Sequence, residues 1–168
     1  TGASIVLNAA SPVDGNGDID EHSITTTGTQ LFTGATVLGA NTSLSGTTVT
    51  FAGGIESSST DNSGTLVTDD STLNIAGDAV FGGTIGSTYT LGSLTVSGTT
   101  AMNGDGSNPM SVATSGAQDY TGAVTLGANT TLSVTDLVAA AINLDSNSTS
   151  YNSTLAEAGT GAISGGIS

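Results

Sequence analysis

The chain contains no lysine and no arginine, and this absence excludes several classes of partner. Its 168 residues include 14 Asp and Glu and a single His, so the formal net charge is −14. Proteins bind nucleic acid and anionic membrane surfaces through Lys and Arg, so neither partner is expected. No apolar run approaches the length of a membrane-spanning helix, and we expect no membrane insertion.

Cysteine is also absent, and aromatic residues make up only 4% of the chain. Stability must therefore come from apolar burial and backbone hydrogen bonds rather than from disulfides or Lys/Arg ion pairs. Low aromatic content and high charge are typical of disorder. Here, however, 36% of the residues are hydrophobic, and they recur in regular alternation with polar ones. This alternation is the period of a half-buried β-strand, so we expect a folded, all-β chain.

One segment of the chain occurs twice. TTGTQLFTGATVLGANTSLS at 26–45 returns as TSGAQDYTGAVTLGANTTLS at 114–133, with 13 identical positions. A shorter period relates LNIAGDAVFGG at 73–83 to LTVSGTTAMNG at 94–104. Repeats of this kind indicate a solenoid, in which stacked coils bury a core that one coil cannot bury alone.

The sequence therefore predicts a single parallel β-solenoid domain over residues 1–168, with about seven or eight coils of about 21–22 residues. The turn-rich stretch 56–64 is expected to bulge from one coil as a loop. The segment 136–144 fits either a short helix capped by Asp136 or a buried strand. The predicted core consists of apolar residues at repeating positions: Val37, Leu38, Leu44, Val49, Phe51, Ile55, Leu73, Ile75, Phe81, Leu94, Val96, Met102, Leu126 and Leu132.

The repeated phrases resemble a family of bacterial surface proteins. TGTQLFTGATVLGANTSLSGTTVTFAGGI, its return at 115–132 and LGSLTVSGTTAMNGDG at 91–106 are similar to repeats of filamentous haemagglutinin-like adhesins and autotransporter-type passengers. The resemblance implies a right-handed parallel β-helix that is exported to the cell surface and acts as a fibrous stalk or adhesin. It implies no catalytic residue and no cofactor.

We therefore expect a non-enzymatic, extracellular building block of a surface fibre, sheath or adhesin stalk. It would be either a self-associating subunit or a segment joined covalently to neighbours in a longer repeat protein. One alternative is an adhesin module that binds a carbohydrate or a host surface. The other is a polysaccharide-acting β-helix enzyme.

An acidic stretch is the one candidate metal site. Its oxygen-bearing side chains alternate as in a calcium-binding loop: Asp14, Asn16, Asp18, Asp20 and Glu21. The match to that loop is imperfect, because Ile19 replaces the glycine of the sharp turn and Thr25 replaces the closing glutamate. A solvated acidic turn is the alternative to a Ca²⁺ site.

Other polar residues carry weaker hypotheses. A hydrolase needs two carboxylates about 5–10 Å apart, and Asp69 with Asp70 or Asp78 could supply them. His22 stands without a second His or Cys and is interpreted as a surface residue.

Threonine and asparagine patterns complete the sequence-based hypotheses. Thr-x-Thr elements at 25–27 and 48–50 do not recur on every coil, as a flat ice-binding face would require. Four Asn-x-Ser/Thr sequons begin at Asn41, Asn129, Asn147 and Asn152. Because Asn41 and Asn129 share a position in the repeat, a turn or an asparagine ladder is expected there.

Overall fold

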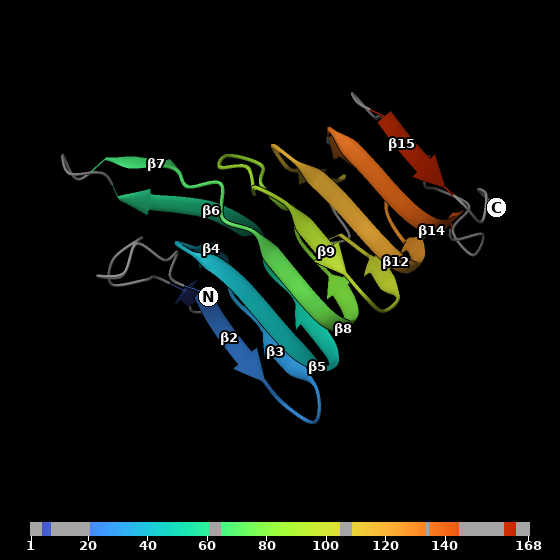
Figure 1. Cartoon of the computed structure of the whole chain (residues 1–168), viewed down its shortest axis with the longest axis horizontal. Helices are drawn as coiled ribbons and strands as arrows, with labels where there is room; N and C mark the ends of the chain where they lie inside the picture. Colours follow the sequence, from blue (N-terminus) through green and yellow to red (C-terminus); the bar gives the residue numbers. More distant parts are fainter. Residues whose placement is uncertain are drawn as a thin grey trace.

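The computed structural model describes residues 5–7, 21–60, 65–104, 109–133, 135–144 and 160–163. Within these residues all regular structure is β-strand, and the strands stack in parallel into a solenoid of about six turns (Figure 1). The prediction of a parallel β-solenoid is confirmed. The segment at 136–144 is a strand and not a helix.

Each coil passes over three faces, which we call A, B and C. Four long strands run over face A and then bend onto face B: β5 (Asn41–Phe51), β8 (Leu73–Phe81), β12 (Ala117–Leu126) and β14 (Asp136–Leu144). Face A also holds β2 (Glu21–Thr25), β9 (Leu94–Val96) and β15 (Thr160–Ile163), and face B holds β3 (Gln30–Phe32) and β10 (Thr100–Met102).

Face C consists of shorter strands: β1 (Ile5–Leu7), β4 (Thr36–Leu38), β6 (Ile55–Thr60), β11 (Met110–Ala113) and β13 (Thr130–Ser133). Isolated bridges through Ile85 join its two halves. The end of β6 leaves the stack and pairs antiparallel with β7 (Leu66–Thr68), forming the hairpin at the upper left of Figure 1.

The coils differ in length more than the sequence predicted. In-register residues on face B are Phe32, Phe51, Phe81, Met102, Leu126 and Leu144. Consecutive members of this row are furthest apart in the chain between Phe51 and Phe81, and closest between Leu126 and Leu144. The longest coil contains the β6–β7 hairpin, so extra residues are accommodated outside the stack while the strand register is kept.

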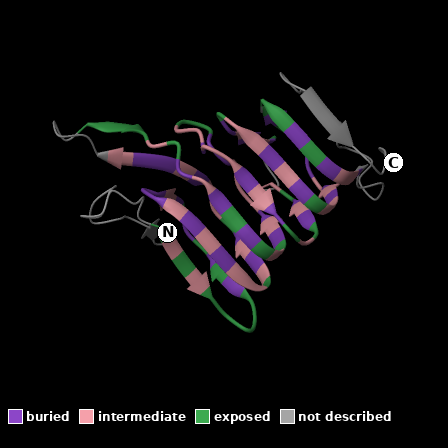
Figure 2. Cartoon of the chain, viewed as in Figure 1, coloured by how far each residue is buried: buried purple, intermediate pink, exposed green. Residues whose placement is uncertain are grey.

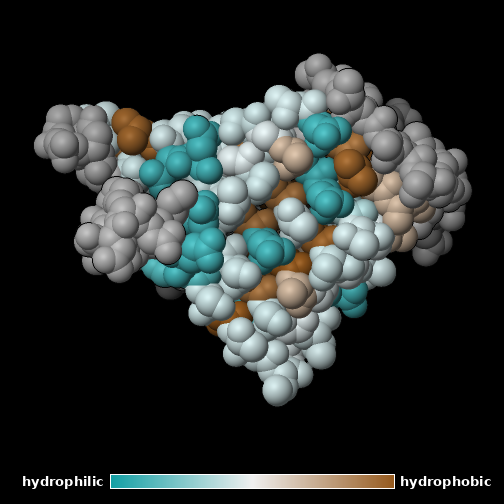
Figure 3. Space-filling model, viewed as in Figure 1, coloured by the Kyte–Doolittle hydropathy of each residue, from teal (hydrophilic) through white to brown (hydrophobic). Residues whose placement is uncertain are grey.

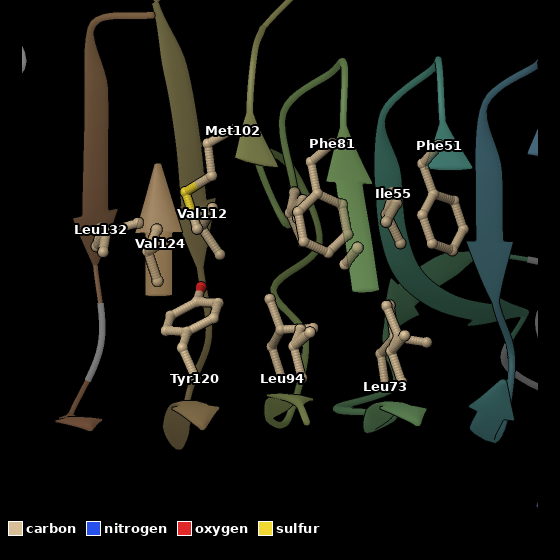
Figure 4. Packing of buried hydrophobic residues seen from close by; sticks show 14 of the residues in the cluster. Phe51, Ile55, Leu73, Phe81, Leu94, Met102, Val112, Tyr120, Val124 and Leu132 are labelled. Atoms are coloured by element: carbon tan, nitrogen blue, oxygen red, sulfur yellow. The ribbon is translucent and has the colours of Figure 1, made fainter. Parts of the chain in front are cut away.

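Inward and outward side chains alternate along every long strand (Figure 2). Thirteen of the fourteen predicted core residues are buried. Val37 is the exception: it lies between Thr36 and Leu38, which face inward, so its own side chain faces outward and is partly exposed. Because coils stack in register, like side chains stack as well. The rings of Phe32, Phe51 and Phe81 follow one another at 4.8 and 5.9 Å between centroids, and Figure 4 shows the last two.

Candidate assembly and binding surfaces

Two glutamine side chains, Gln30 and Gln118, make equivalent hydrogen bonds at corners of the solenoid. Gln30 Nε2 donates to the Ile24 carbonyl at 3.2 Å, to Thr26 Oγ1 at 3.4 Å and to the Ser45 carbonyl of the next coil at 2.8 Å. Each amide therefore connects two consecutive coils across the turn that precedes it. Because a buried carbonyl without a partner is costly, these contacts help to keep adjacent coils in register.

Gln118 repeats this arrangement in the second copy of the segment. Its Nε2 donates to the Val112 carbonyl at 3.3 Å, to Thr114 Oγ1 at 3.4 Å and to the Ser133 carbonyl at 3.2 Å. Every partner of Gln118 thus occupies the same place in the repeat as the corresponding partner of Gln30. The identical positions of the long repeat therefore include a shared corner structure, which the sequence analysis did not anticipate.

The two glutamines differ in their second amide atom. Gln118 Oε1 accepts a hydrogen bond from the hydroxyl of Tyr120 at 3.0 Å, and both side chains are fully buried. Phe32 stands where Tyr120 stands in the second copy, and the buried Gln30 Oε1 has no hydrogen-bond partner. Desolvation in the core raises the pKa of Tyr120 above its ordinary range.

The two copies of the repeat occupy different faces. Gln30 lies on face B, where the strand register leads through Val49, Ala79 and Thr100 to Val124. Gln118 lies instead on face A, in register with Leu94. The second copy is therefore rotated by one face relative to the first.

This rotation places Asn41 and Asn129 at different corners, so they do not form a ladder. Asn41 Oδ1 accepts a hydrogen bond from the Thr72 N–H of the next coil at 2.9 Å. Asn129 Oδ1 is buried and has no hydrogen-bond partner. Asn41 is the first residue of β5 and not a turn residue, whereas Asn129 directly precedes β13, so their surroundings differ.

The three carboxylates that were candidates for hydrolysis each accept a hydrogen bond from a nearby Ser or Thr side chain. Asp69 Oδ2 accepts from Ser71 Oγ at 2.9 Å, and Asp70 Oδ1 accepts from Ser115 Oγ at 3.0 Å. Asp78 Oδ1 accepts from both the N–H and the hydroxyl of Thr99, at 2.8 and 2.9 Å. Asp69 therefore bonds within its own turn, whereas Asp70 and Asp78 connect different coils.

Four of the five candidate calcium ligands, Asp14, Asn16, Asp18 and Asp20, lie outside the described residues. Glu21 begins β2 and is exposed. Among the described residues, no group of three His, Cys, Asp or Glu side chains is placed to hold a metal ion. His22 is partly buried rather than a surface residue, and its Nδ1 atom is buried without a hydrogen-bond partner.

Hollows among the described residues include two at corners of the solenoid. The larger, of about 400 Å³, is bordered mainly by turn glycines such as Gly53 and Gly83, together with Pro109 and Met110. The smaller, of about 140 Å³, is lined by residues of polar type: Glu21, Asn41, Thr42, Ser43, Thr72 and Asn74. The amide, hydroxyl and carboxylate groups of these residues are hydrogen-bonding partners for a small polyhydroxylated ligand.

One outward row of face B is uncharged, whereas Asp78 is exposed in a neighbouring row of the same face. It consists of Leu31, Thr50, Val80, Ala101 and Thr125, on successive strands in register. In the view of Figure 3 the surface is mostly white, with teal groups and with brown bands interrupted by other residues. Larger exposed apolar side chains are Leu31, Val138 and, on the hairpin, Leu66 and Val67.

The fold defines the chain as a parallel β-solenoid protein. No family model, no curated protein and no solved structure matches the chain. No helix long and apolar enough to cross a membrane occurs within the described part of the chain.

Proposed function

We propose that this chain is a structural, non-enzymatic building block of an extracellular bacterial fibre, sheath or adhesin stalk. The observation that carries the proposal is the continuous stack of parallel coils, in which outward positions are filled mainly by small, uncharged side chains. Such a stack is built by repetition and forms an extended body whose length increases with coil number. Stiffness and length are the properties that a stalk requires.

The charge pattern supports the same proposal. A net charge of −14 without any Lys or Arg disfavours nucleic acid and anionic surfaces as partners. It also opposes lateral clumping of copies at low ionic strength. The resemblance of the repeats at 26–45 and 114–133 to filamentous haemagglutinin-like proteins supports the extracellular location.

Electron microscopy and sedimentation test this proposal. The purified chain should form elongated particles whose length increases with protein concentration, and lateral bundling should increase with salt because screening weakens the repulsion. A species that stays monomeric at high concentration, at both low and high ionic strength, would contradict a self-associating subunit.

An adhesin module that binds a neutral carbohydrate is the second candidate function, and the small polar hollow favours it. Glu21, Asn41 and Asn74 supply acceptors and donors there, as hydroxyl-rich ligands require. The surplus of acidic residues disfavours anionic glycans. Glycan-array binding that is lost in Asn74→Ala and kept in Asn103→Ala, an exposed asparagine outside the hollow, would support this function. Equal binding by both variants would contradict it.

A further inference from the structure

The acidic side chains of the described residues are distributed unevenly around the rod. Most of them lie on face A, on face C or at the turn before β8: Glu21, Glu56, Asp69, Asp70, Asp119 and Asp136. Within the described ranges only Asp78 projects from face B, and its carboxylate already accepts two hydrogen bonds from Thr99. Face B is therefore the side of the described rod with the least negative charge.

The middle of face B is a sheet whose outward side chains are small. On this face β5, β8, β10 and β12 each pair with a strand on both sides, so they lie away from the two ends of the stack. Thr50, Val80, Ala101 and Thr125 follow one another across these four strands and are partly exposed. Such short side chains lose little rotamer freedom when they are buried.

The corner between faces A and B adds no bulk to this surface, because glycines occupy it in successive coils. A Cβ atom added to Gly98 would lie 2.5 Å from the Gly77 carbonyl oxygen of the preceding coil, and one added to Gly46 would lie 2.8 Å from that of Gly28. A Cβ atom added to Gly28 would meet no atom within 4 Å. Face B therefore has no side chain at this corner that would hold a flat partner at a distance.

The area of face B suits a weak contact between two sheets. It consists of β3, β5, β8, β10, β12 and the second half of β14. With about three outward positions per strand, about 4.8 Å between strands and about 6.7 Å between outward residues, it covers roughly 600 Å² per copy. Two such faces would bury roughly 1,200 Å², which is at the lower limit for a specific interface.

We propose that two copies of this chain associate side by side through face B, with one sheet packed against the other. A second copy has the same charge of −14 and no Lys or Arg, so a contact through face A or face C would bring carboxylates together. A contact through face B leaves those carboxylates outside the interface. Because both copies use the same surface, it closes as a twofold pair. The inference rests on the proposed function of a self-associating subunit and names the side through which rods associate laterally.

A charge at the centre of face B tests the contact. Thr50→Asp places it there, and Ser45→Asp is the matched control, because Ser45 is a partly exposed residue of the same strand on face A. Both variants have the same net charge. Lateral pairing is measured by sedimentation at high salt and by electron microscopy, and thermal melting verifies folding. We expect Thr50→Asp to weaken pairing tenfold or more, and Ser45→Asp to stay close to the parent.

Lysine at the same two positions separates a buried contact from general repulsion. Both lysine variants lower the net negative charge, so repulsion alone would make both pair more strongly. We expect Ser45→Lys to pair at least as well as the parent, and Thr50→Lys to pair less well because the interface would bury its charge.

The outcomes distinguish this inference from the proposed function. If folded Thr50→Asp pairs as well as Ser45→Asp, or if Thr50→Lys pairs better than the parent, face B is not the contact and the proposed function stands. Fibres of the parent that remain single rods at high salt lead to the same conclusion. If the parent stays monomeric at high concentration and at every ionic strength, both are wrong.

Discussion

Removing the tyrosine hydroxyl from the second copy of the repeat should lower the stability of the fold, and adding one at the equivalent position of the first copy should raise it. Tyr120→Phe removes the donor to Gln118 Oε1 and leaves this buried atom unpaired, as Gln30 Oε1 already is. An unpaired buried polar atom costs about 1–3 kcal/mol. For a chain of this size that corresponds to a melting temperature about 2–12 °C lower.

Phe32→Tyr should have the opposite effect. Gln30 Nε2 lies 3.2, 3.4 and 2.8 Å from its three hydrogen-bond acceptors. Gln118 Nε2 lies 3.3, 3.4 and 3.2 Å from the three equivalent acceptors. The two amides therefore have the same pose, and a tyrosine at position 32 would supply the donor that Gln30 Oε1 lacks. One added hydrogen bond should stabilise the fold by about 1 kcal/mol.

Phe81→Tyr is the control, because Phe81 is also buried on face B and no unpaired side-chain acceptor is found on its own strand. This variant should be destabilised by the unpaired hydroxyl. All variants are compared by thermal melting and by urea unfolding. The reasoning would be refuted if Tyr120→Phe melted with the parent, or if Phe32→Tyr lost as much stability as Phe81→Tyr.

Four further results are expected. Gly98→Ala should cost more than about 1 kcal/mol because its Cβ meets the preceding coil, whereas Gly28→Ala should be neutral or slightly stabilising; equal melting would contradict the corner packing. In urea unfolding, Gln118→Leu should lose more stability than Gln30→Leu, because it also leaves the Tyr120 hydroxyl without its acceptor; the reverse order would exclude that account. Because its pKa is raised, Tyr120 keeps its proton in the folded chain, while in the unfolded chain it loses the proton above pH ~10. The free energy of unfolding should therefore fall by about 1.4 kcal/mol per pH unit above that pH. If Tyr120→Phe shows the same dependence of stability on pH, this account is wrong. If the acidic loop at 14–21 binds Ca²⁺, a hundredfold excess over Kd should stabilise the chain by about 2.7 kcal/mol, and identical melting in calcium and in chelator would identify a solvated turn.

The sequence predicted the fold class and most of the core because inward residues alternate with polar ones in every strand. Val37 was assigned wrongly because Val37 and Leu38 are consecutive apolar residues, and only the strand register shows which of them faces inward. Tyr120 was missed because a buried tyrosine requires a buried acceptor, and the sequence does not show that Gln118 is one.

The surfaces were less predictable than the core. The predicted coil length of about 21–22 residues did not locate the longest coil, because the β6–β7 hairpin adds residues outside the stack and residue spacing does not reveal where a chain leaves the coil. The stretch 56–64 was expected to be a loop, but Glu56 lies in β6 and its carboxylate accepts the N–H of Tyr89 at 2.7 Å. Contacts between residues so far apart in the chain follow from stacking and leave no local pattern.

The rotation of the second repeat by one face shows which unit of this sequence can be interchanged. Gln30, Thr36 and Thr42 face inward six residues apart, and each begins or lies in the strand of the next face. A gain or loss of one such unit would therefore turn everything downstream to a neighbouring face while the interior pattern continues. Evolution could in this way move a displayed side chain around the rod without redesigning the core that supports it.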